Sequence, residues 1–196
     1  VMTETAKICK CVYLIGNHDF LENNMDRVDA LSPIIDSLNI DNIIYYKDKG
    51  CYEDENILWC VYSLRDHNTR PNIPESTDKY KIGLFHGPIE GSSNDFGFIF
   101  DDGYSVDRFE GCDVVFAGDI HKRQQFKIPG NKKAYMVGST IIQNFGESIK
   151  NHGYGVYNVK KEKYKSFNLD NPQPYLNFMI KDIEDIENEK EILING

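Results

Sequence analysis

Three short runs in the sequence combine histidine with amide or carboxylate side chains. Each run follows a stretch of apolar residues and contains a glycine, and three of the five histidines of the chain lie in these runs. Imidazole nitrogens and carboxylate or amide oxygens are common ligands of divalent metal ions. The runs are Gly16-Asn17-His18-Asp19, His86-Gly87 and Gly118-Asp119-Ile120-His121.

Each run taken alone also has an ordinary structural explanation. Asn17 and Asp19 beside a glycine are typical of an Asx turn. His86 suits a strand-end histidine bonded to the backbone, and Asp119 suits a turn or the cap of a short helix. Their joint occurrence, in this order and each after a predicted strand, favours one shared site over three unrelated turns.

The strands that position these runs are predicted from apolar patterning. Continuous apolar stretches over 10–15, 80–85 and 113–117 predict buried strands that end at the three runs. In open α/β sheets, the loops at the carboxyl ends of the strands gather in one crevice. We therefore expect the three runs to lie close together.

The rest of the chain is predicted to supply a helix and further strands. Apolar residues recur at helical spacing over 25–38, and the main helix is expected to start with Ser32 as N-cap and Pro33 as its first residue. A hairpin around Lys49-Gly50 is expected to join two predicted strands, 43–46 and 57–62. The connection 88–104 has a length that is often functional. The further strands are predicted at 43–46, 57–62, 124–128, 134–138, 154–159 and 164–168, the last four of them antiparallel.

The chain is acidic. It has 196 residues, with Lys+Arg 22, Asp+Glu 31 and a net charge of −9. This balance argues against a protein that binds nucleic acid through phosphate contacts alone. Residues 181–196 contribute −4 of the charge, from six acids and two lysines. Part of the negative charge is therefore local to this segment.

The cysteine pattern and the hydropathy of the sequence indicate the cellular compartment in which we expect the protein. The five cysteines are scattered and form no C-x-x-C pattern, which favours reduced, mostly buried thiols in an intracellular protein over a disulfide scaffold. No apolar run approaches the roughly 20 residues that cross a bilayer, and residues 1–6 have no signal-peptide pattern. We expect an intracellular protein of the cytoplasm or nucleus without a membrane span.

The order of the three runs resembles the last three motifs of calcineurin-like metallophosphoesterases, of which the final one is usually Gly-His-x-His. The resemblance narrows to SbcD-type DNA repair exonucleases and covers about residues 8–170. It implies an α/β fold of two β-sheets packed as a sandwich and flanked by helices, with the first strand–helix units missing. The segments that narrow it are Tyr135-Met136-Val137-Gly138-Ser139, Gln143-Asn144-Phe145-Gly146-Glu147 and His152-Gly153-Tyr154.

The resemblance also implies a set of metal ligands. Asn17 and His86 would bind one divalent ion, and His121 would bind a second. Two ions about 3.5–4 Å apart clamp the attacking and leaving oxygens of an in-line displacement. Mixed nitrogen and oxygen ligands suit Mn²⁺ or a similar ion.

The same resemblance assigns a catalytic role, and position along the chain indicates which cations could bind the substrate. His18 would sit beside the scissile phosphate and protonate or stabilise the leaving oxygen. Asp19 would orient His18, as carboxylates commonly do for histidines. Lys122 and Arg123 follow the last motif directly, and they either contact a substrate phosphate or are surface charges.

The chain departs from the family pattern in two places. Asp119 stands where the family normally has histidine; a carboxylate can replace an imidazole on such an ion, so we expect Asp119 to bind metal with altered selectivity. The family's first two motifs, Asp-x-His and Gly-Asp-x-x-Asp/Asn, do not occur before Asn17. We therefore expect three ligands for one ion, one for the other, and weak phosphodiester hydrolysis by this chain alone.

The predicted function is that of an SbcD-type DNA exonuclease/endonuclease in DNA end processing and double-strand-break repair. The expected partners are DNA ends, an SbcC-type coiled-coil ATPase and a second copy of the chain, which would dimerise through the region 25–38. Residues 1–170 would form the phosphoesterase domain, and 171–196 a linker and the start of a capping region. The alternatives are another calcineurin-like phosphoesterase, or a non-catalytic phosphoesterase-like binding module.

Overall fold

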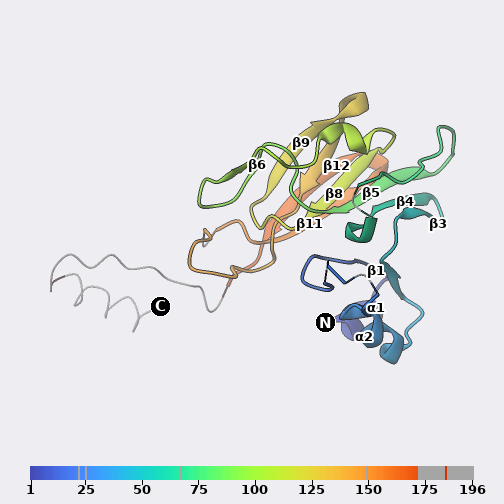
Figure 1. Cartoon of the computed structure of the whole chain (residues 1–196), viewed down its shortest axis with the longest axis horizontal. Helices are drawn as coiled ribbons and strands as arrows, with labels where there is room; N and C mark the ends of the chain where they lie inside the picture. Colours follow the sequence, from blue (N-terminus) through green and yellow to red (C-terminus); the bar gives the residue numbers. More distant parts are fainter. Residues whose placement is uncertain (22, 25, 67, 149, 172–183, 185–196) are drawn as a thin grey trace.

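A mixed six-stranded sheet forms the centre of the computed structural model, which describes residues 1–21, 23–24, 26–66, 68–148, 150–171 and 184 (Figure 1). The four inner strands are parallel, and each edge strand is antiparallel to its neighbour. In spatial order the strands are β3 (Gly50–Asp54), β4 (Ile57–Tyr62), β5 (Tyr80–His86), β8 (Val114–Gly118), β10 (Lys132–Met136) and β9 (Gln124–Ile128).

Side chains of the inner strands alternate between two covered faces of this sheet. On one face Tyr62, Phe85 and Phe109 pack edge to face, with ring centroids 5.2 Å to 6.4 Å apart. On the other face Tyr135 stacks on Tyr164, with ring centroids 4.1 Å apart. Because both faces are covered, the strands are continuous apolar runs rather than alternating ones.

A small parallel pair of strands lies beside the large sheet. The helix α1 (Met2–Ala6) leads into β1 (Cys11–Leu14), which pairs with β2 (Ile43–Tyr46). The connection between the two strands contains α2 (Leu31–Leu38). In Figure 1 these N-terminal elements lie together at one end of the large sheet.

Two antiparallel hairpins complete the strands. The first joins β6 (Ser92–Ser93) and β7 (Ile99–Phe100) within the long connection 88–104. The second joins β11 (Gly153–Asn158) and β12 (Lys163–Asn168). Short 3-10 helices lie at Leu64–Asp66, Val106–Phe109, Pro129–Asn131 and Val159–Lys161.

The α/β class and the strands expected from the sequence are confirmed, within two residues at either end. The predicted hairpin around Lys49-Gly50 is wrong. Strand β2 pairs with β1, and the antiparallel partner of β4 is β3, which the sequence reading missed. The turn between β3 and β4 includes Glu55, whose φ of 49° is unusual for a residue with a side chain.

The predicted start of the helix in the region 25–38 is also wrong. The helix begins at Leu31, and the backbone N–H groups of Leu31 and Ser32 donate to the Asp29 carboxylate at 3.0 Å and 2.7 Å. Asp29 therefore accepts from two free N–H groups of the first turn, which is the capping role that was expected of Ser32. The expected antiparallel pairing of the last four strands is confirmed for β9 with β10 and for β11 with β12, and on its other side β10 is parallel to β8.

All five cysteines are free, and Cys11, Cys60 and Cys112 are buried. Within the part of the chain that the structure describes, no helix has both the length and the apolar character that a membrane crossing requires. The predicted linker and capping region 171–196 lies outside the described residues, except for Asn171 and Glu184.

Candidate functional site

The carboxyl ends of two neighbouring parallel strands bring the second and third runs together. His86 is the last residue of β5 and lies in register with Gly118, the last residue of β8. The next residue, Asp119, places its Oδ1 atom 3.6 Å from His86 Nε2. The expected meeting of these two runs at one edge of the sheet is confirmed.

The first run reaches the same point from the small parallel sheet. Asn17 follows β1, and its Oδ1 atom lies 3.1 Å from His86 Nε2. An amide oxygen, an imidazole nitrogen and a carboxylate oxygen thus converge. Ligand atoms about 2.1 Å from an ion and at right angles to one another lie about 3 Å apart, and the two distances from His86 Nε2, 3.1 Å and 3.6 Å, are near that value.

Two glycines make room for the His86 ring. A Cβ atom added at Gly16 would lie 3.1 Å from His86 Cε1, and one added at Gly118 would lie 3.1 Å from His86 Nδ1. Contacts this short are tighter than most side chains tolerate. The glycines that precede Asn17 and Asp119 therefore have a steric reason, because they let the imidazole approach the backbone of both loops.

Asp119 has a backbone conformation that is rare for a residue with a side chain. Its φ is 86°, in the left-handed region that favours glycine. Such conformations cost free energy and persist where the surrounding structure imposes them, often at functional sites. The strain turns the carboxylate toward His86.

His121 is oriented by a buried carboxylate. Its Nδ1 atom lies 2.7 Å from Glu147 Oε1, and the Glu147 side chain is only 5% exposed. The same carboxylate accepts hydrogen bonds from the Asn144 side-chain amide at 2.7 Å and from the Gln143 backbone N–H at 2.9 Å. A donor at Nδ1 leaves Nε2 as the nitrogen that can bind a metal ion.

The role of Glu147 was missed in the sequence analysis, although the segment around it carried the resemblance. His121 and Glu147 are 26 residues apart, so only the folded chain shows their contact.

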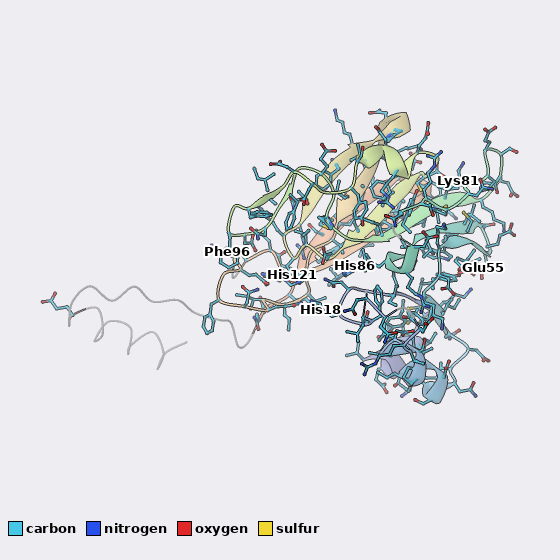
Figure 2. All side chains as sticks on the ribbon, in the orientation of Figure 1. His18, Glu55, Lys81, His86, Phe96 and His121 are labelled. Atoms are coloured by element: carbon cyan, nitrogen blue, oxygen red, sulfur yellow. The ribbon has the colours of Figure 1, made fainter. Side chains whose placement is uncertain are left out.

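The predicted catalytic pair is not coupled as expected. Asp19 Oδ2 accepts a hydrogen bond from the Gly16 backbone N–H at 2.7 Å, and the Asp19 N–H donates to Gly16 O at 3.1 Å. Asp19 therefore closes a local turn rather than orienting His18. His18 is exposed and lines a cavity of about 250 Å³ with Phe20 and Arg27. Figure 2 shows His18, His86 and His121 in the same part of the molecule.

The two predicted substrate-binding cations have different surroundings. Arg123 donates to Asn168 Oδ1 at 2.7 Å and to the Phe167 carbonyl at 2.8 Å, so its guanidinium group fastens β12 to the site loop. Lys122 Nζ donates to Ser93 Oγ at 3.1 Å and is half-buried. Both side chains line a cavity of about 440 Å³ next to His121.

His152 secures the loop that carries Glu147. It is buried, with Nδ1 2.7 Å from Ser139 Oγ and Nε2 2.6 Å from the Ser148 carbonyl. Both ring nitrogens are occupied by these contacts, which leaves His152 a structural role.

No group of three or more His, Cys, Asp and Glu side chains is arranged to hold a metal ion among the residues that the structure describes. The convergence at His86 contains two such side chains, and its third is the amide of Asn17. His121 contacts Glu147, which is already engaged by three donors. Metal binding therefore remains a prediction that rests on the donor set around His86.

Comparison with known proteins gives one informative similarity. The chain is 31% identical over 192 residues to an uncharacterized protein of Acanthamoeba polyphaga mimivirus. The match covers 92% of this chain but only 14% of the length of the viral protein. No family model and no solved structure matches the chain.

Proposed function

We propose that this chain carries part of a two-metal phosphodiesterase site and acts as a DNA exonuclease/endonuclease of the SbcD type in DNA end processing. The observation that carries the proposal is the convergence of Asn17 Oδ1, His86 Nε2 and Asp119 Oδ1 from three separate loops. The motif order that resembles calcineurin-like metallophosphoesterases supplies the reaction class.

The site residues are assigned two roles in this proposal, which are metal binding and action on the substrate. Divalent ions at such a site supply Lewis-acid stabilisation and a nucleophilic water. Asn17, His86 and Asp119 would hold one Mn²⁺ ion, and His121, fixed by Glu147, would contribute to the second.

His18 is proposed to act on the leaving oxygen rather than on metal. It is exposed beside Asn17, where a bound phosphodiester can reach it. A histidine there donates a proton to the oxygen that leaves, which is general acid catalysis. Asp19 holds the turn that presents both residues.

DNA is favoured over small phosphoesters by the charges around the site. Lys122, Arg123 and Lys150 line the cavity beside His121. Positive side chains next to a reacting phosphate suit a substrate with further phosphates along a strand. The alternative of a non-catalytic binding module is favoured by one point, which is that His121 is the single predicted ligand of the second ion among the residues that the structure describes.

The proposal is tested by metal binding and hydrolysis measured separately. Free Mn²⁺ is followed by electron paramagnetic resonance while the full chain is titrated, and cleavage of linear DNA is followed in Mn²⁺. We expect His86→Ala to lose Mn²⁺ binding, and His18→Ala to bind Mn²⁺ but lose cleavage.

Asp36→Asn is the matched control, because it removes an exposed carboxylate on α2. It should change neither measurement. Cleavage by His18→Ala at the original rate would contradict the assigned role of His18. Mn²⁺ binding that is the same in the original chain and in His86→Ala would contradict the metal site.

A further inference from the structure

Three phenylalanine side chains are exposed in the β6–β7 turn and in the loop that carries Glu147. Phe96 is 71% exposed, and Phe98 and Phe145 are each 58% exposed. Phe96 and Phe98 lie in the turn between β6 and β7, and Phe145 lies in the loop that carries Glu147. Of the three, only Phe96 also lines a cavity with candidate metal ligands, and an exposed aromatic ring in such a place can mark a binding surface.

Phe96 is fixed against the Glu147 loop. A Cβ atom added at Gly146 would overlap the Phe96 ring, so the ring lies against the backbone of Gly146, where a side chain at position 146 would be. The two loops are also joined by a hydrogen bond from the Ser148 backbone N–H to Asp95 Oδ2, at 3.2 Å. The ring is therefore held on one side while most of its surface remains open to solvent.

The Phe96 ring borders the candidate metal ligands. A cavity of about 290 Å³ is lined by Phe96 together with Asp119, His121 and Glu147. Figure 2 shows Phe96 and His121 in the same region of the molecule. A group bound against Phe96 would thus lie next to the position where the phosphodiester is expected.

A second, cationic cavity adjoins the first. The cavity of about 440 Å³ is lined by Lys122, Arg123 and Lys150 and by one carboxylate, Asp95, so its charged side chains sum to +2 with histidines neutral. This local excess of positive charge occurs in a chain whose net charge is −9. Asp95, His121 and Lys122 line both cavities.

We infer that these two cavities bind an unpaired nucleotide segment of single-stranded DNA, with a base stacked on Phe96 and the neighbouring phosphates held by Lys122 and Lys150. The inference rests on the proposed function and specifies the substrate as a strand with unstacked bases. Single-strand binders combine such a positive groove with aromatic side chains, and every base offers a face for stacking. A base within a closed duplex offers no free face to the ring.

The test measures binding without hydrolysis. Single-stranded deoxyoligonucleotides with 2-aminopurine in the terminal segment, and abasic strands of the same length, are titrated with the full chain in EDTA. Stacking quenches 2-aminopurine fluorescence, and anisotropy of a distal dye reports binding of either strand. We expect a preference of about 5-fold or more for the strand with bases.

The variants distinguish stacking on the Phe96 ring from general effects of the protein surface on DNA binding. Phe96→Ala should reduce the preference to near unity, and Phe96→Trp should retain it. Gly146→Ala should also lose it, because the new methyl group displaces the ring that remains in the chain. Phe98→Ala is the matched control, since Phe98 is similarly exposed but packs on Phe100, with ring centroids 4.9 Å apart.

Equal binding of base-containing and abasic strands by the original chain would overturn the inference, as would unchanged quenching in Phe96→Ala. Absence of binding to either strand would overturn it as well. Cleavage of linear DNA in Mn²⁺, measured in parallel, reports on the proposed function. If linear DNA is cleaved but base-containing strands bind no better than abasic strands, the stacking role of Phe96 is refuted and the proposed function is not.

Discussion

The Glu147 carboxylate is the group that fixes the orientation of the His121 ring. It accepts from His121 Nδ1 through Oε1, while Oε2 accepts from the Gln143 backbone N–H. In Glu147→Gln one of these oxygens becomes an amide that donates, so one existing donor loses its acceptor. Because such partners fix the tautomer of a metal-binding histidine, we expect Mn²⁺ affinity to fall about 10-fold to 100-fold.

Two measurements distinguish orientation of His121 from simple loss of stability. Nitrogen NMR shifts of His121 should show a mixture of tautomers in Glu147→Gln, and Mn²⁺ titration should show the weaker binding. Glu110→Gln is the control, because Glu110 forms an exposed ion pair with Arg70 at 3.3 Å. A Glu147→Gln variant with the His121 tautomer and Mn²⁺ affinity of the original chain would refute the orienting role.

Single residues also show where reasoning from sequence succeeds and where it stops. The meeting of His86 and Asp119 was predictable, because adjacent parallel strands end at one edge, and His86 ends one such strand while Asp119 directly follows its neighbour. The local role of Asp19 was one of two explanations, and the ordinary one, a turn closed onto Gly16, is what the structure contains. Glu147 was not predictable as a partner of His121, since their contact depends on the path of a whole loop.

Among the elements, α2 depends on a single buried carboxylate at its start. Asp29 is 2% exposed and accepts hydrogen bonds from the first turn of α2, the Ser32 hydroxyl and the Tyr45 hydroxyl. Burial alone would raise the pKa of Asp29, but the hydrogen bonds from Ser32 and Tyr45 outweigh burial and lower the pKa. Burial of the Tyr45 hydroxyl, its hydrogen bond to Asp29 and the charge of Asp29 together raise the pKa of Tyr45.

The lowered pKa of Asp29 gives a signed prediction. The folded state favours the ionised carboxylate, so this stabilisation is complete above the usual pKa of 3.8 and is lost as pH falls through the lower folded-state pKa. We expect Asp29→Asn to reduce the free energy of unfolding at pH 7 by about 1–3 kcal/mol. The difference between the two proteins should shrink below about pH 4.

Urea unfolding at pH 7 and at pH 3 measures this difference directly. Asp36→Asn, on the exposed side of the same helix, should change the free energy of unfolding by less than about 0.5 kcal/mol at either pH. A difference between the original chain and Asp29→Asn that grows as the pH is lowered would have the wrong sign and would refute this account.

The errors at the level of elements have a common physical cause. Strand β3 contains Glu53 and Asp54 and lies at the edge of the sheet, so it lacks the apolar run that marks a buried strand. With β3 overlooked, the next apolar runs were joined across Lys49-Gly50. The central strands β5 and β8 were predicted well because both of their faces are covered, which makes their sequences apolar throughout.

For the molecule as a whole, the net charge of −9 conceals a positive cavity beside His121. The salt dependence of DNA binding distinguishes local from global charge. Each phosphate neutralised by a lysine in single-strand binding contributes about −0.7 to the slope of log K against log salt concentration. If Lys150 holds one such phosphate, Lys150→Gln should reduce the steepness of this slope by about 0.7.

Lys163→Gln supplies the matched change of charge at a distance. Lys163 is exposed at the turn end of the β11–β12 hairpin, five residues along β12 from Asn168, which lines the cationic cavity. That separation is about 17 Å in an extended strand, beyond the Debye length at physiological salt. Single-stranded DNA binding measured from about 50 to 200 mM salt should therefore keep its slope in Lys163→Gln. Equal slopes in the two variants would mean that strand binding responds to the charge of the whole molecule, and the cavity beside His121 would lose its assigned phosphate.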